Sequence, residues 1–173
     1  MKSPLRILIT RLSHIGDCVL TVPLVQQLRT VWPDCEILWA MESPTHKLLG
    51  HLPEIQEIVT VPKGYLKKPS AILQLRRQLR AWKPDVVLDP QSLTKSAFLG
   101  WLSGAPVRIG LAGSHQKELS GWLNNVHVPM AAGTTHLLDR TLQLLPAITK
   151  YHPPAVASTS DLAGLGQPAN SGA

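Results

Sequence analysis

One carboxylate stands at a corner where an apolar run gives way to a helical pattern. Residues 11–23 read RLSHIGDCVLTVP, so that Asp17 follows Gly16 shortly after the apolar segment 5–10. An aspartate in the first turn of a helix offsets the helix dipole, which is worth about 0.3–1 kcal/mol. The same dipole favours an ionised carboxylate, which can accept a proton from a nearby hydroxyl. Residue type and position leave both interpretations of Asp17 open, as a helix cap and as a catalytic base.

A second polar cluster follows another apolar run. Asp89 and Gln91 come at the end of DVVLDP, residues 85–90, and Lys95 lies four residues after Gln91. The helix dipole disfavours a cation near a helix start, so Lys95 indicates a partner anion such as a phosphate or carboxylate of a substrate. The alternative is a lysine on a solvated helix face. Ligands collect at the carboxyl ends of parallel strands, and we therefore expect both clusters at one edge of a sheet.

Positive charge is concentrated in one part of the chain. The formal net charge is +6, which favours anionic partners such as phosphates, acidic sugars, nucleic acid or an anionic membrane face. Residues 66–83, LKKPSAILQLRRQLRAWK, hold six of the cations beside an apolar helix face made by Ile72, Leu75, Leu79 and Trp82. This stretch is either a solvated helix face or a contact surface for a phosphorylated acceptor or anionic lipid.

Several kinds of site are not indicated. The seven histidines show no H-x-x-x-H or HExxH spacing, so we expect no metal, and we expect no cofactor. There is no P-loop and no GxSxG elbow, and Gly16 alone supports dinucleotide binding only weakly. His14 could contact a substrate, whereas His136 and Asp139 open a later helix where capping is the simpler interpretation. Cys18 and Cys35 are expected to be reduced thiols packed in the fold.

Alternating patterns predict an α/β fold. Apolar, β-branched runs indicate strands, and helical periodicity separates them. Such alternation implies right-handed crossovers and a Rossmann-like, doubly wound parallel sheet covered on both faces. The strands are expected at 5–10, 36–41, 57–62, 85–90, 107–111 and 125–128, and the helices at 19–32, 70–82, 93–102 and 135–145.

Composition also predicts where the protein works and how the chain is divided. No apolar run reaches the roughly 18 residues that span a bilayer, and residues 1–14 lack the pattern of a signal peptide, so we expect a cytoplasmic protein. Residues 1–150 form the expected domain. Residues 151–173 are rich in Pro, Ala, Ser and Gly and are expected to be a disordered tail.

Three motifs in order resemble a known family. The segments RLSHIGDCVLTVPLVQQLR, VVLDPQSLTKSAFLGWLSGAPVRIGL and HLLDRTLQLL are similar to the N-terminal half of bacterial lipopolysaccharide heptosyltransferases, which belong to glycosyltransferase family 9. The resemblance extends over about residues 5–149. It implies the N-terminal, acceptor-binding domain of a GT-B glycosyltransferase. The implied activity is inverting transfer, without an obligatory metal, from a nucleotide-sugar such as ADP-heptose to an anionic inner-core glycolipid.

The resemblance also assigns roles to residues. It implies that Asp17 is the general base, and that Lys95 binds the anionic acceptor. Ser13, His14 and Gly16 would line the same cleft, and Gln91 is expected among the acceptor-binding residues. Family members commonly have glycine where this chain has Ser92.

The resemblance leaves the activity of the chain itself open. The tail begins where the donor-binding domain is expected, so that domain is predicted to be absent and the chain to be inactive alone. The expected partners are a nucleotide-sugar, an anionic glycolipid acceptor and, peripherally, the inner membrane, and nucleic acid is not expected. The alternatives are a non-catalytic module that binds the acceptor or a partner protein and, more weakly, a nucleotide-binding domain.

Overall fold

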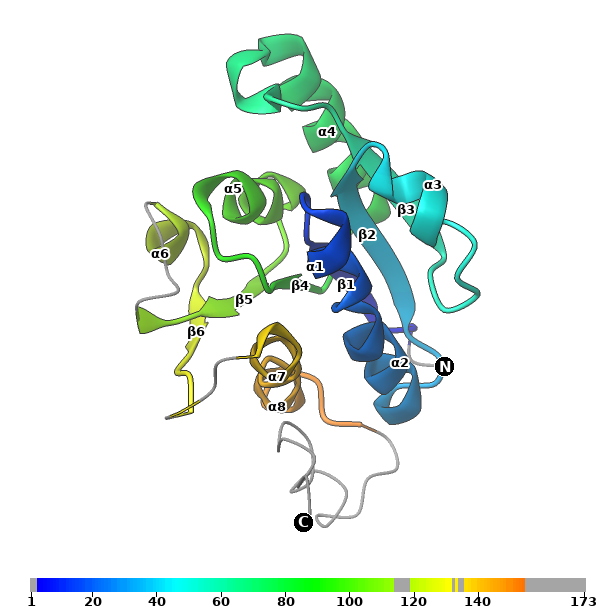
Figure 1. Cartoon of the computed structure of the whole chain (residues 1–173), viewed down its shortest axis with the longest axis vertical. Helices are drawn as coiled ribbons and strands as arrows, with labels where there is room; N and C mark the ends of the chain where they lie inside the picture. The colour runs from blue at the N-terminus through cyan, green and yellow to red at the C-terminus, as the bar shows by residue number, and fades with distance from the viewer. Residues whose placement is uncertain (1–2, 114–118, 132, 134–135, 155–173) are drawn as a thin grey trace.

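Parallel strands form one sheet in the order β3-β2-β1-β4-β5-β6 (Figure 1). The computed structural model describes residues 3–113, 119–131, 133 and 136–154. The strands are β1 Arg6–Thr10, β2 Glu36–Glu42, β3 Glu57–Val61, β4 Val86–Asp89, β5 Val107–Leu111 and β6 Val126–Val128. In register, Ile7 of β1 lies between Ile37 of β2 and Val86 of β4. Every predicted strand is present, with its ends shifted by one residue at most, and the predicted α/β Rossmann-like class is confirmed.

Helices cover both faces of the sheet. On one face, α4 (Pro69–Trp82) and α5 (Thr94–Ser103) bury Leu75, Leu79 and Leu99 against strand residues such as Leu8 and Val87. On the other face, α2 (Val22–Val31) and α8 (Leu145–Thr149) pack against the alternate strand positions, among them Ile7, Ile9 and Leu88. Because both faces are covered, these strands are almost wholly apolar and lack in–out alternation.

Two predicted helices are present but shorter than expected, and each has an unpredicted short helix beside it. The expected helix 19–32 is α2, where Pro23 falls in the first turn, and the single turn α1 (Ile15–Val19) precedes it. The expected helix 135–145 is α7 (Leu137–Leu142), with α8 after it, and residue 135 lies outside the described residues. Pro146 stands in the first turn of α8, where its missing N–H is not needed, so this proline begins a helix.

Short elements escaped the sequence patterns. These are α3 (Thr45–Leu49), the 3₁₀ turn η1 (Tyr65–Lys67) and α6 (Ser120–Leu123). None exceeds five residues, too few to establish a helical period. The beginning of the expected tail packs on the domain, because the indole of Trp32 donates a hydrogen bond of 3.1 Å to the carbonyl of His152. Residues 155–173 of that tail lie outside the described part of the chain.

The strand order creates the place for a ligand. Chain order runs outward from β1 to β3 on one side and from β4 to β6 on the other, so β1 and β4 adjoin at the switch point. The loops after these two strands therefore meet beyond the same edge of the sheet. Ligands bind at such a crevice in open α/β sheets.

Candidate functional site

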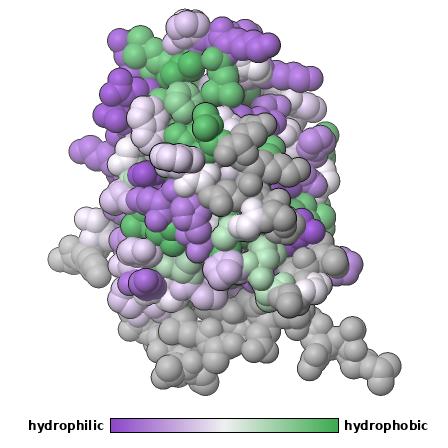
Figure 2. Space-filling view, turned by 90° about the vertical axis from the view of Figure 1, so that its left-hand side faces the viewer, coloured by the Kyte–Doolittle hydropathy of each residue, from purple (hydrophilic) through white to green (hydrophobic). Residues whose placement is uncertain are grey.

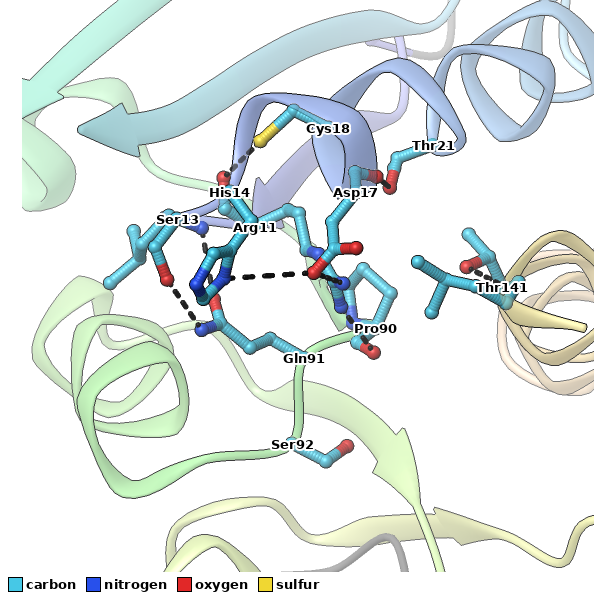
Figure 3. A network of polar contacts seen from close by, with 12 residues as sticks. Arg11, Ser13, His14, Asp17, Cys18, Thr21, Pro90, Gln91, Ser92 and Thr141 are labelled. Carbon is cyan, nitrogen blue, oxygen red and sulfur yellow. Dashed lines mark hydrogen bonds and ion pairs between the residues drawn. The ribbon is translucent and has the colours of Figure 1, made fainter. Parts of the chain in front are cut away.

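Arg11 follows β1 and places the carboxylate of Asp17. The Arg11 side chain is buried, and its guanidinium donates a bond of 3.1 Å to the carbonyl of Pro90 and pairs with Asp17 at 2.6 Å between Nη2 and Oδ2. Asp17 lies at the third position of α1, which begins before the helix expected at 19–32. Figure 3 shows the Asp17 carboxylate turned toward Arg11 and the loop after β4. Arg11 therefore joins the two loops and fixes the direction of the acid.

Asp17 stays open to a ligand despite this ion pair. Its side chain is 38% exposed, and it lines a cavity of about 510 Å³ beyond the ends of β1 and β4. His14 Nδ1 approaches the same Oδ2 atom at 3.8 Å, while most of the His14 side chain is exposed. A hydroxyl entering the cavity can therefore reach the carboxylate. Asp17 also occupies the first turn of α1, where it makes no side-chain capping hydrogen bond but can offset the helix dipole, so its position leaves both the structural and the base interpretation open.

The unusual backbone conformation in the first loop is at His14, whereas the sequence pointed to Gly16. His14, directly before α1, has a φ of 66°, in the left-handed region that a residue with a side chain rarely adopts. Gly16 lies within α1, and a Cβ added there would meet no protein atom within 4 Å. The glycine is therefore not demanded by its backbone. It is exposed and, contrary to the expectation, is not among the residues that line the cavity with Ser13 and His14.

Gln91 and Lys95 reach across to the first loop through Ser13. The Gln91 amide accepts a bond of 3.0 Å from the Leu12 N–H and donates one of 3.2 Å to Ser13 Oγ. Lys95 Nζ donates to the same hydroxyl at 2.6 Å. Gln91 thus holds the first loop in place, while Lys95 brings a positive charge to the cavity that Asp17 lines.

The partner of Lys95 within the chain is Glu42, at the end of β2. Lys95 Nζ lies 3.6 Å from Glu42 Oε1, and the Glu42 side chain is 14% exposed. The sequence indicated a partner anion for Lys95 but did not point to Glu42. It could not do so, because only the pairing of β1 with β2 brings residue 42 beside the first loop, where its N–H bonds to the Leu12 carbonyl.

Hydrogen bonds to the buried carboxylate of Asp89 hold the loop after β4 in place. The carboxylate of Asp89 is fully buried and accepts bonds from the Ser92 N–H at 2.8 Å and from Asn124 Nδ2 at 2.9 Å. Burial raises the pKa of Asp89 to about 6, and the bond from Asn124 partly opposes this shift. Asp89 is thus a positioning residue beneath the cavity, whereas Gln91 and Lys95 line it.

The backbone conformation of Ser92 explains why family members commonly have glycine at this position. Its φ is 49°, a left-handed conformation that glycine adopts without cost. In this chain the serine hydroxyl is buried, donates to the Asp89 carbonyl at 2.9 Å and accepts from the Leu111 N–H at 2.8 Å. Gly110 is also required, because a Cβ there would lie 2.3 Å from Asn124 Nδ2.

The last motif contributes a cation to the cavity. Leu137 and Arg140 of α7 are among its lining residues, opposite the loops after β1 and β4. His136 precedes α7 and its carbonyl accepts a bond from the Arg140 N–H, in line with a local role. Together, Arg11, Lys95 and Arg140 make the cavity lining rich in positive charge, with Asp17 as its acid.

These features define a class of protein. A parallel sheet of this order, with a charged cavity at its switch point, is a ligand-binding α/β domain of the Rossmann type. The profile of glycosyltransferase family 9 (heptosyltransferase) matches residues 72–164, more than half of the chain. The chain therefore belongs to glycosyltransferase family 9, and the predicted family is confirmed.

Individual relatives agree with this assignment. Lipopolysaccharide core heptosyltransferase OpsX of Haemophilus influenzae is 27% identical over 122 residues, which cover 70% of this chain and 34% of that protein. Lipopolysaccharide heptosyltransferase 1 of Salmonella typhimurium is 25% identical over 159 residues, 87% of this chain and 50% of that protein. The chain thus spans about a third to a half of the length of these curated relatives.

Solved structures share the fold. One is the heptosyltransferase WaaC of Escherichia coli, solved with ADP-2-deoxy-2-fluoro heptose. The match covers 92% of this chain and 53% of the WaaC chain, with a TM-score of 0.74 and 23% sequence identity. A glycosyl transferase family 9 structure from Veillonella parvula matches 84% of this chain and 41% of that chain, with a TM-score of 0.70 and 25% identity. The chain therefore has the fold of one part of these larger proteins.

Proposed function

We propose that this chain is the acceptor-binding half of a heptosyltransferase that transfers heptose from ADP-heptose to the inner core of lipopolysaccharide. The observation that carries the proposal is the shared cavity of about 510 Å³, which is lined by both the carboxylate of Asp17 and the ammonium of Lys95. The similarity to lipopolysaccharide heptosyltransferases supports the choice of sugar and acceptor. The ADP-2-deoxy-2-fluoro heptose bound to WaaC supports an ADP-linked donor.

Asp17 acts as the general base in this proposal. As the acceptor oxygen attacks the anomeric carbon of the donor, the C–O bond forms, the bond from that carbon to the ADP oxygen breaks, and the hydroxyl proton passes to Asp17. Attack opposite the leaving group inverts the anomeric centre. Arg11 holds the carboxylate by the 2.6 Å ion pair, so that it needs little reorganisation during the reaction. A positioned base of this kind contributes roughly 10²–10⁴-fold in rate.

The remaining cavity residues bind the acceptor. Lys95 supplies a charge-assisted donor for an anionic group, and Arg140 contributes a second cation to the lining. Ser13 and His14 line the cavity and are placed to contact acceptor hydroxyls. Gln91 acts mainly by holding Ser13 and Leu12 in place.

The acceptor class also suggests where the enzyme works. A lipopolysaccharide precursor is an anionic glycolipid, so we expect the protein to be cytoplasmic and to act peripherally at the inner membrane. No helix in the described part of the chain is long and apolar enough to cross a bilayer. The donor nucleotide is expected to bind to the half of the enzyme that this chain does not cover.

Acceptor binding by the chain tests the first part of the proposal. Calorimetric titration with a Kdo-containing inner-core acceptor should show binding that Lys95→Ala weakens by about tenfold or more, the loss expected for one charge-assisted bond. Lys47, which is exposed on α3 and outside this cavity, gives the matched control Lys47→Ala. Equal affinity in the wild type and both variants would contradict the placement of the acceptor.

Turnover tests the base. With a donor-binding domain of a relative supplied, ADP release should appear, and Asp17→Asn should lower kcat by roughly 10²–10⁴-fold with little change in KM. Asparagine retains an oxygen that can accept the Arg11 bond, so positioning is largely preserved. The exposed Asp34→Asn is the control. Acceptor binding without restored turnover would favour the non-catalytic binding module.

A further inference from the structure

Half of the large hydrophobic side chains that are exposed in the described part of the chain lie on one layer of helices. Of the large hydrophobic residues that the structure describes as exposed, five belong to this layer or to the turn that enters it: Leu66, Leu73, Trp101, Leu119 and Trp122. The layer is continuous, since η1 contacts α4, α4 packs on α5, and α5 packs on α6. Figure 2 shows a hydrophobic area over the upper part of this side of the molecule, with hydrophilic residues at its margins.

Aromatic rings connect this surface to the acceptor cavity. Tyr65 stacks on Phe98 with ring centroids 6.5 Å apart, and Phe98 stacks on Trp101 at 5.6 Å. The Tyr65 hydroxyl donates a bond of 2.5 Å to the carbonyl of Lys95. Phe98 lies three residues after Lys95, and Trp101 three residues after Phe98, so each successive pair is adjacent on the surface of α5. The apolar surface thus begins about two helical turns from the ammonium that lines the cavity.

The charge on the η1 and α4 part of this surface has a single sign. Residues 58–84 contain seven lysines and arginines and no aspartate or glutamate. On α4, Arg76 and Arg77 lie three and four residues after the exposed Leu73, so these three side chains are neighbours on the helix surface. Exposed Lys67 and Lys68 follow Leu66 directly in sequence. Apolar side chains and cations are therefore interleaved, with no acid in that segment to neutralise them.

Resting on the proposed function, we propose that the surface formed by η1, α4, α5 and α6 docks the enzyme on an anionic phospholipid membrane. Tryptophan and leucine side chains enter the headgroup region, while lysines and arginines contact lipid phosphates. The cations favour an anionic lipid surface over a second copy of this chain, because the same stretch of positive charge would repel itself. The glycolipid acceptor then keeps its lipid part in the bilayer while its sugar reaches the cavity beside Lys95.

Vesicle sedimentation tests this surface with the chain alone. The chain should sediment with vesicles of phosphatidylcholine and phosphatidylglycerol, and only weakly with phosphatidylcholine alone, and added salt should reduce the binding. Arg76→Gln/Arg77→Gln should lower the partition coefficient by about 25-fold, from about fivefold for each basic residue near the surface. Trp101→Ala/Trp122→Ala should also lower it. Both tryptophans are more than half exposed, so the fold should persist, as circular dichroism would check.

Matched controls separate this proposal from the previous one. Lys47→Gln and Leu48→Ala, which change an exposed cation and an exposed leucine of α3, should bind vesicles like the wild type. Asp17→Asn should also bind them normally, while the tryptophan variant should retain affinity for a delipidated, water-soluble acceptor. A wild-type chain that binds vesicles but has no affinity for that acceptor would refute the proposed function and leave the membrane surface standing.

Three outcomes would overturn the membrane proposal. One is equal sedimentation with neutral and anionic vesicles, and another is equal loss of binding in the α3 controls. The third has two parts: the wild-type chain does not bind vesicles, and analytical ultracentrifugation shows that it forms a stable dimer, which Trp101→Ala/Trp122→Ala dissociates. That result would assign the surface to a second copy of the chain.

Discussion

The buried carboxyl of Asp89 should make the stability of the domain depend on pH. Asp89 lies beneath the loop that carries Gln91 and Lys95, and its oxygens accept bonds from Ser92 and Asn124. Burial raises its pKa to about 6, from about 3.9 in an unfolded chain. The folded protein therefore holds this proton more tightly than the unfolded protein does.

The sign and size of the effect follow from this difference. A shift of about two pKa units corresponds to about 3 kcal/mol. The contribution of Asp89 to the free energy of unfolding is fully present below about pH 4, where both states are protonated. It is lost as the pH rises through about 6, because the unfolded chain gains from ionisation while the folded chain must ionise a buried group.

Asp89→Asn should remove this dependence. The new amide oxygen can still accept from the Ser92 N–H. Asn124 Oδ1, which is buried without a hydrogen-bond partner among the described residues, can accept from the new amide nitrogen once the Asn124 amide turns over. Between pH 4 and pH 7, the free energy of unfolding of the variant should rise by about 2 kcal/mol relative to that of the wild type, because part of the roughly 3 kcal/mol is already lost at pH 4.

Urea unfolding followed by circular dichroism from pH 4 to pH 7 measures this difference. Ser103→Ala serves as the control, because it removes a buried hydroxyl and no titrating group, and its stability difference should not vary with pH. A difference between wild type and Asp89→Asn that stays constant from pH 4 to pH 6 would refute the reasoning. It would mean that the bonds from Ser92 and Asn124 outweigh burial and keep the carboxylate ionised.

Two further substitutions probe the loops around the cavity. Ser92→Gly should lower the free energy of unfolding by about 1 kcal/mol, because leaving the buried Leu111 N–H without its acceptor costs about 1–3 kcal/mol and outweighs the relief of a positive φ. Ser92→Ala should cost more than Ser92→Gly, since it loses the hydroxyl and keeps the strained φ, and the reverse order in urea titrations would contradict this account. Glu42→Gln should tighten calorimetric binding of an anionic acceptor several-fold, because Lys95 loses its internal counter-ion at 3.6 Å. Weaker binding by Glu42→Gln would instead show that Glu42 is needed to hold the ammonium in place.

The strands and the principal helices could be predicted from local patterns. Runs such as LRILIT and DVVLDP are apolar without alternation, and that composition is sufficient for a strand covered on both faces. The helical period of residues 70–82 likewise fixed α4, whose Leu75 and Leu79 are buried as expected. Prolines were harder to interpret. Pro146 was expected to end a helix, but in the structure it lies in the first turn of the next helix, α8.

The sequence could locate the candidate site but could not show which of its residues contact one another. Motif order placed Asp17, Gln91 and Lys95 at the edge of a parallel sheet, and the structure brings all three to one cavity. The sequence did not show that Gln91 uses both ends of its amide on the first loop, nor that Asp89 is buried beneath it. Those facts depend on distance in space, which residue types do not reveal.

The sequence by itself determined the family, the alternation of strands and helices, and which side chains could carry charge to the switch point. Only the tertiary structure decided which of those charges meet. Lys95 and Ser13 are separated by 82 residues, and Glu42 joins them only because β2 pairs with β1. The physical reason is that periodicity and turn chemistry act over a few residues, whereas ion pairs and burial depend on how distant segments pack together.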